Sequence, residues 1–127
     1  MSLLWLNLLI IVPVIAYRVA RYKVPQHLCS ITGASVGVVI APISLGLYSW
    51  YFVSIIGFVP GVIGLILSLI HETPGYYLAL NLELIQVGKV VTGFKQLAIV
   101  EVLNSIVWLT CYGAIGYAID CFRSRKK

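Results

Sequence analysis

Long apolar stretches alternate along this chain with short polar breaks. The first stretch, at about 3–20, ends at a short basic loop that contains Pro25, and the last one occupies about 97–119. A helix needs about 20 residues to cross the hydrocarbon core of a bilayer. We therefore predict the first and last membrane spans at 3–20 and 97–119.

The middle of the chain holds a nearly continuous apolar run over 28–70, which is about twice the length of one span. The residues that interrupt it are Pro42, Gly46, Pro60 and Gly61. We predict two helices, at about 28–47 and 50–70, joined by a tight turn. The aromatic residues at that turn are of the kind that favours the membrane interface.

The region after 70 combines several patterns. Pro74 and Gly75 in "HETPGYY" predict a turn. Residues 78–85 alternate in the manner of a strand, whereas from Glu83 the apolar residues follow a helical period. The second pattern predicts an amphipathic helix at about 83–96, suited to lie in the membrane interface.

The basic residues form two clusters, each beside an apolar stretch. They are Arg18, Arg21 and Lys23, and then Arg123, Arg125, Lys126 and Lys127. Basic residues beside membrane spans indicate the cytoplasmic side, and the C-terminal tail is the stronger of the two signals. If both clusters are cytoplasmic, the number of crossings between them must be even. The helices at 28–47, 50–70 and 97–119 would make three crossings. Either the rule fails at one cluster, or 28–70 makes one net crossing through a re-entrant or broken helix, or 76–95 also spans. Four spans are the leading expectation and three the second.

Composition supports the membrane assignment. Of the 127 residues, 61% are hydrophobic and 10% are charged, where a soluble domain carries about a quarter charged residues. We predict an all-α fold: a small polytopic membrane bundle of three or four transmembrane helices with one interfacial helix, forming a single domain over 1–127. The net charge of +5 lies beside the spans and accompanies no nucleic-acid motif, so membrane lipids are the expected partners.

Small residues recur at the spacing that lets helices pack closely in lipid. They are Gly33, Gly37 and Ala41 in one stretch, and Gly57, Gly61 and Gly64 in the next. We expect both groups to pack against helices, either within this chain or in another membrane protein.

The last span carries a polar face. Its members are Glu101, Asn104, Ser105, Trp108, Tyr112 and Gly116, while Ile99, Leu103, Ile106, Val107, Ala114 and Ala118 occupy the opposite face, expected to face lipid. A carboxylate within a membrane costs a few kcal/mol and suggests a proton or cation site. The alternative is an interhelical hydrogen bond, worth about 0.6 kcal/mol on average. We favour the hydrogen bond because the sequence pattern offers no second intramembrane charge.

Other chemistries find little support. His71 and Glu72 begin like the H-E-x-x-H zinc motif, but the fifth position is Gly75, and we interpret the pair as a membrane exit. The three cysteines form no C-x-x-C pair, and the four acidic residues show no paired spacing. We expect no enzyme activity, no metal and no cofactor.

The leading functional hypothesis is a small accessory, regulatory or immunity-type protein of the bacterial inner membrane. It would act by helix association with another membrane protein or with itself, its C-terminus being cytoplasmic. The alternative is a small oligomeric proton- or cation-coupled transporter or channel that uses Glu101, with helices broken at Pro42 and Pro60.

Overall fold

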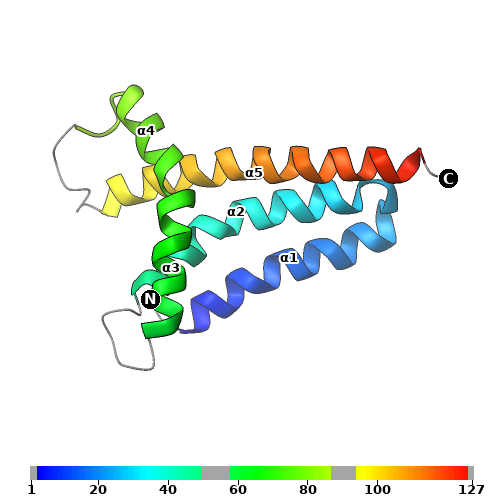
Figure 1. Ribbon diagram of the computed structural model, residues 1–127, viewed down its shortest axis with the longest axis horizontal. Coiled ribbons are helices and arrows are strands. Elements are labelled where there is room, and N and C mark those ends of the chain that lie inside the picture. Colours follow the sequence, from blue (N-terminus) through cyan, green and yellow to red (C-terminus); the bar gives the residue numbers. More distant parts are fainter. Residues whose placement is uncertain (1–2, 50–57, 87–93, 126–127) are drawn as a thin grey trace. The chain divides into compact units, whose positions relative to one another are not determined.

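A computed structural model describes residues 3–49, 58–86 and 94–125 of the chain (Figure 1). All regular structure in these ranges is helical, which confirms the predicted all-α class. The elements are α1 (Leu3–Lys23), a short 3-10 helix η1 (Pro25–His27), α2 (Leu28–Ser49), α3 (Phe58–His71), α4 (Thr73–Asn81) and α5 (Phe94–Ser124).

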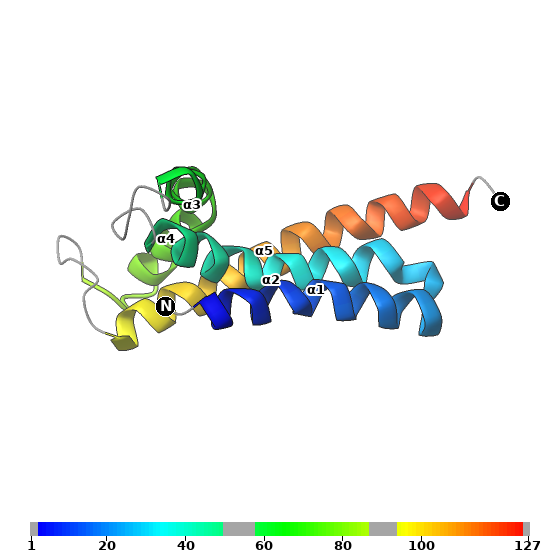
Figure 2. The same cartoon turned by 90° about the horizontal axis from the view of Figure 1, so that it is seen from below.

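The helical stretches have the character of a membrane protein. Within the described residues, three stretches are long and apolar enough to cross a bilayer: Pro25–Tyr48, Phe58–Asn81 and Lys95–Ser124 (Figures 1 and 2). Their exposed surfaces carry large aliphatic side chains, such as Ile66 on α3 and Ile115 on α5, which are 56% and 57% exposed. Such surfaces are stable in lipid, where apolar side chains need no burial inside the protein.

Two compact units make up the chain. The first consists of Met1–Ile40 and Trp108–Lys127, and the second of Ala41–Val107. Both α2 and α5 contribute to both units, whereas α1 belongs to the first, and α3 and α4 belong to the second.

In the first unit, α2 and the C-terminal part of α5 run antiparallel in close contact. A β-carbon added at Gly33 would fall on the Tyr112 carbonyl, and one added at Gly37 would fall on the Trp108 carbonyl. The seam continues where Gly116 meets the Cys29 carbonyl. Glycine permits this backbone-to-backbone approach because it has no side chain to separate the helices.

In the second unit, α3 and α4 form one bent helical stretch. The turn predicted at "HETPGYY" is wrong, because Thr73 onward is helical and only a break near Glu72 separates the two helices. Pro74 lies in the first turn of α4. Proline is tolerated there because a first-turn residue needs no N–H donor and the fixed φ suits a helix.

The interfacial helix predicted at about 83–96 does not begin at residue 83, because α4 ends just before that residue. Residues 83–86 are not helical, 87–93 lie outside the described residues, and 94–96 are the first residues of α5. Glu83 has a left-handed backbone with φ of 57°. The Glu83 N–H donates to the Leu80 carbonyl and the Leu84 N–H donates to the Ala79 carbonyl. This is a Schellman ending, which terminates a helix where the sequence pattern predicts one to begin.

A small apolar cluster joins α4 to the N-terminal part of α5. Its centre is Ala79, Ile85 and Val100, and the side chains packed on it include Ile99 and Leu103. Those last two residues were expected to face lipid. They pack inside the unit instead, because the turn after α4 brings Ile85 back against α5.

Candidate functional site

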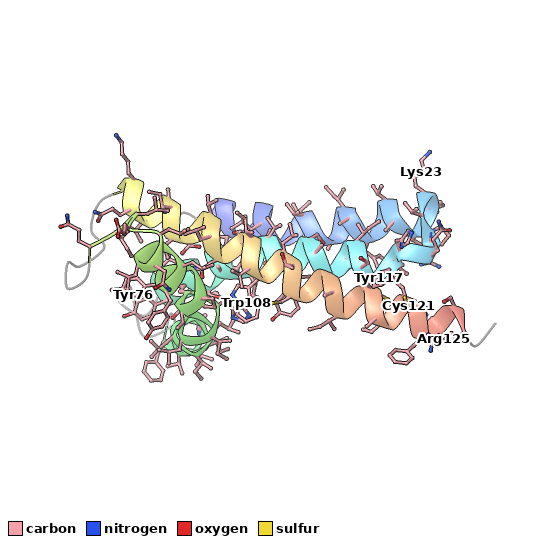
Figure 3. All side chains as sticks on the ribbon, turned by 90° about the horizontal axis from the view of Figure 1, so that it is seen from above. Lys23, Tyr76, Trp108, Tyr117, Cys121 and Arg125 are labelled. Atoms are coloured by element: carbon pink, nitrogen blue, oxygen red, sulfur yellow. The ribbon has the colours of Figure 1, made fainter. Side chains whose placement is uncertain are left out.

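The second unit contains a cavity of about 410 Å³ between the α3–α4 stretch and the N-terminal part of α5. Its lining combines polar, aromatic and aliphatic side chains: Ser68, Leu69, Glu72, Thr73, Tyr76, Tyr77, Leu97, Val100 and Glu101. No lysine or arginine of the described residues lines it. Tyr76, one of these lining residues, belongs to α4 and is labelled in Figure 3. The cavity is therefore acidic, with apolar and tyrosine walls.

Two carboxylates from different elements line this cavity. Glu72 lies at the break between α3 and α4, where it caps α4 without a side-chain hydrogen bond, and Glu101 belongs to α5. Glu72 Oε1 and Glu101 Oε2 are both buried and have no hydrogen-bond partner among the described residues. Ionised oxygens in such a place are costly unless a proton, a cation or a donor satisfies them.

His71 and Glu72 are interpreted from the sequence as a membrane exit, and that interpretation stays a prediction. The structure adds that His71 is only 5% exposed and that Glu72 lines the cavity. Both residues fall inside Phe58–Asn81, one of the three stretches suited to cross a membrane. A second carboxylate in an apolar stretch therefore accompanies Glu101.

Asn104 lies one turn beyond Glu101 on α5 and is fully buried. Its Oδ1 accepts a hydrogen bond of 2.6 Å from the Gly75 N–H, in the first turn of α4. The first four N–H groups of a helix have no partner within that helix, so Asn104 satisfies one of them from a neighbouring helix. Gly75 allows this contact because an added β-carbon would overlap the Asn104 side chain.

The same hydrogen bond fixes the orientation of the Asn104 amide. Because Oδ1 faces a donor, Nδ2 points elsewhere, and it is buried with no partner among the described residues. Asn104 thus fixes the α4–α5 junction and leaves both N–H donors of its amide nitrogen unused. Two carboxylate oxygens and one amide nitrogen are the buried, unpartnered side-chain atoms in the described part of the chain.

The other members of the predicted polar face have different surroundings. Ser105 is half-buried in the second unit. Trp108 and Tyr112 belong to the first unit, where their ring centroids are 5.6 Å apart and their backbones meet α2. The face therefore divides into an acidic part, with Glu101 and Asn104, and a packing part, with Trp108 and Tyr112.

The predicted packing residues also differ from one another. Ala41 is fully buried, and Gly61 and Gly64 are buried on α3. A β-carbon added at Gly64 would fall on the backbone of Leu47 and Tyr48 at the end of α2. The remaining predicted position, Gly57, lies outside the described residues.

The two basic clusters lie at the same end of the first unit. Asp120 of α5 accepts hydrogen bonds from the Cys29 N–H at 3.1 Å and the Ser30 N–H at 2.8 Å, in the first turn of α2. This cap joins the C-terminal part of α5 to the start of α2, shortly after Lys23. Figure 3 shows Lys23 and Arg125 at this end, while Lys126 and Lys127 lie outside the described residues.

Asp120 is a residue whose role the sequence did not reveal. A carboxylate at a helix N-terminus is favourable because it accepts from unpaired N–H groups and complements the helix dipole. The sequence shows only that Asp120 lies beside a basic tail. It cannot show the partner, because the Ser30 N–H that donates to Asp120 is 90 residues away along the chain.

The described part of the chain contains no group of three or more His, Cys, Asp or Glu residues that could hold a metal ion. No protein-family model, curated protein or solved structure matches this sequence.

Proposed function

We propose that this protein is a small proton- or cation-coupled transporter or channel, in which Glu72 and Glu101 bind the proton or cation. The observation that carries the proposal is the pair of buried carboxylate oxygens without hydrogen-bond partners that line one cavity. Their segments, Phe58–Asn81 and Lys95–Ser124, are both apolar enough to cross a membrane.

The electrostatics of the cavity favour a positive ligand. Two carboxylates that share one cavity destabilise each other when both are ionised, and burial adds a desolvation cost for each. In the described part of the chain, no basic side chain lines the cavity to compensate this charge. A proton or a small cation would neutralise this charge, and the tyrosine walls suit a cation as well.

The topology of the chain also supports the proposal. Because α2 and α5 run antiparallel, the segment between Ser49 and Phe94 must start and finish on the same side of a membrane that both helices cross. If 58–81 crossed completely, one of the connections, 50–57 or 82–93, would have to cross back. Each of these two connections is shorter than the helix of about 20 residues that is required to cross the membrane.

We therefore infer that α3 and α4 enter and leave on one side. A bent, re-entrant stretch that lines a cavity is a common arrangement in transporters, where irregular backbone at membrane depth surrounds the ion. The break at Glu72 places a carboxylate at such a bend. The chain would then have three full crossings, by α1, α2 and α5.

From the sequence, an interhelical hydrogen bond is favoured for Glu101 because the pattern offers no second intramembrane charge. Glu72 provides a second carboxylate in the same cavity, so docking on another membrane protein becomes the second proposal. The same flux measurement ranks the two.

The test is flux in liposomes that contain the purified protein. A pH-sensitive dye reports proton flux, and separate sodium and potassium indicators report the cations. We expect flux with the wild-type protein and at least a tenfold loss with Glu72→Gln or Glu101→Gln. Glutamine preserves the size of the side chain and much of its hydrogen bonding but cannot ionise.

Glu83→Gln is the matched control, since it makes the same chemical change at an exposed residue outside the cavity. It should retain wild-type flux. Wild-type liposomes that conduct neither protons nor these cations would contradict the proposal and return priority to docking.

A further inference from the structure

A second cavity lies in the first unit, separate from the acidic one. It has a volume of about 440 Å³ and lies among α1, α2 and the C-terminal part of α5. The lining residues that matter here are Tyr17, Leu28, Thr32, Val36, Tyr112 and Arg123. The cavity is thus largely apolar and aromatic, with one guanidinium among its lining groups.

A basic hollow adjoins this cavity. It measures about 520 Å³ and is lined by Tyr17, Arg18, Arg21 and Tyr22, so Tyr17 belongs to both. Arg18 and Arg21 are exposed on the last turns of α1. Tyrosines beside arginines at the end of a membrane helix are typical of the level of the lipid headgroups.

Acidic groups compensate Arg123 more than they compensate Arg18 and Arg21. Among the described residues, no carboxylate lines the hollow beside Arg18 and Arg21. Arg123 lies near the Asp120 carboxylate, and its Nη1 has a weak contact of 3.5 Å with the Cys29 sulfur. The nearby carboxylate, Asp120, already accepts hydrogen bonds from two N–H groups of α2. This end of the first unit therefore has spare guanidinium donors and a surplus of positive charge.

We propose that these two hollows form one binding site for an anionic phospholipid. The arginines Arg18, Arg21 and Arg123 bind the phosphate headgroup, and an acyl chain occupies the cavity beside Val36 and Tyr112. Guanidinium groups bind phosphate through paired, charge-assisted hydrogen bonds. Basic pockets between membrane helices bind anionic headgroups on the cytoplasmic side, where such lipids are concentrated.

A phospholipid explains the site better than a soluble phosphate does. A soluble anion would use the arginines and leave the apolar cavity without a role. A lipid uses both, because its charge and its chain are covalently joined. This proposal is independent of the carboxylate site, which lies in the other unit.

The experiment measures lipid binding to the full protein in detergent, by native mass spectrometry and by the shift of the melting temperature. Phosphatidylglycerol and phosphatidylcholine with identical acyl chains are compared. We expect phosphatidylglycerol to bind and to raise the melting temperature, with phosphatidylcholine doing so weakly. The double variant Arg18→Gln/Arg21→Gln, and separately Arg123→Gln, should weaken phosphatidylglycerol binding about tenfold or more.

The control is the double variant Lys95→Gln/Arg125→Gln, which also removes two positive charges but from residues that line neither hollow. It should bind like the wild type. Equal weakening in the control would show an effect of general surface charge and would overturn the proposal. Equal binding of the two lipids would show that the headgroup is not recognised and would overturn it as well.

Two further measurements test the acyl chain. Glycerol phosphate provides the anionic group without a chain and should not stabilise the protein. Val36→Phe fills part of the cavity and should reduce lipid binding while Arg18 and Arg21 remain. Stabilisation by glycerol phosphate equal to that by the lipid would show a phosphate site and contradict the lipid site.

Discussion

At the residue scale, Glu83 has an unusual backbone for its residue type. Its φ of 57° lies in the left-handed region, which costs about 1–2 kcal/mol for a residue with a β-carbon. The position is the C′ residue of a Schellman ending, where glycine is usual. The Glu83 side chain is exposed, so it gains no packing in return.

We predict that Glu83→Gly stabilises the protein by about 0.5–1 kcal/mol, the relief of strain exceeding the added flexibility of glycine. Chemical unfolding in detergent micelles, followed by circular dichroism, measures the change. Glu83→Ala removes the same charge but retains a β-carbon, and it should leave stability nearly unchanged. If alanine stabilised as much as glycine, the cause would be charge rather than backbone strain.

The residues of the acidic cavity show where sequence reasoning succeeded and where it could not. The helical period located Glu101 and Asn104 on one face of the last span. It could not find their partners, because Asn104 meets Gly75 across 29 residues of sequence. Glu72 was missed because Pro74 and Gly75 indicated a turn, whereas both belong to the first turn of a helix.

At the element scale, the seam between α2 and α5 consists of glycines that face carbonyl groups. The spacing of Gly33 and Gly37 predicted a close helix contact. Spacing alone does not identify a partner, which the structure gives as α5 through Tyr112 and Trp108. Gly116 contributes from the other helix, and the shared contacts set α2 and α5 antiparallel.

We predict that Gly37→Ala destabilises the protein by about 1–3 kcal/mol, because the new methyl group would overlap the Trp108 backbone and force the helices apart. Gly113→Ala is the matched control on α5. Its β-carbon would lie 3.4 Å from that of Ala34, an ordinary contact. It should be neutral or stabilising by up to about 1 kcal/mol, since alanine favours helix more than glycine does.

Thermal unfolding of both variants in one detergent compares them directly. Equal stability of Gly37→Ala and Gly113→Ala would mean that the seam relaxes without cost, and the close approach would then not contribute to the fold.

At the scale of the whole molecule, the membrane class follows from composition and the length of the apolar stretches. The number of crossings does not, because the basic clusters set only an even count between them. The antiparallel seam and the Asp120 cap are the basis for the three crossings proposed above. They join residues that are far apart in sequence, which a reading along the chain cannot do.

We predict the sidedness of four positions from the re-entrant arrangement. Single cysteines at Lys23 and Ser124 should react with an impermeant reagent from one side of the membrane, and cysteines at Phe58 and Glu83 from the other. The measurement uses oriented vesicles and a background in which Cys29, Cys111 and Cys121 are replaced. A complete crossing by 58–81 would place Phe58 and Glu83 on opposite sides and contradict the prediction.

The length of α5 has a consequence for the membrane in which the protein works. Its 31 residues extend about 46 Å, while the hydrocarbon layer is about 30 Å thick. The surplus must be accommodated by tilting the helix or by letting one end leave the hydrocarbon. Glu101 lies near the N-terminal end, so a thicker bilayer would submerge its carboxylate and a thinner one would bring it to water. Hydrophobic mismatch would then tune this acidic site, and the acyl-chain length of the surrounding lipid would act on it without any direct contact.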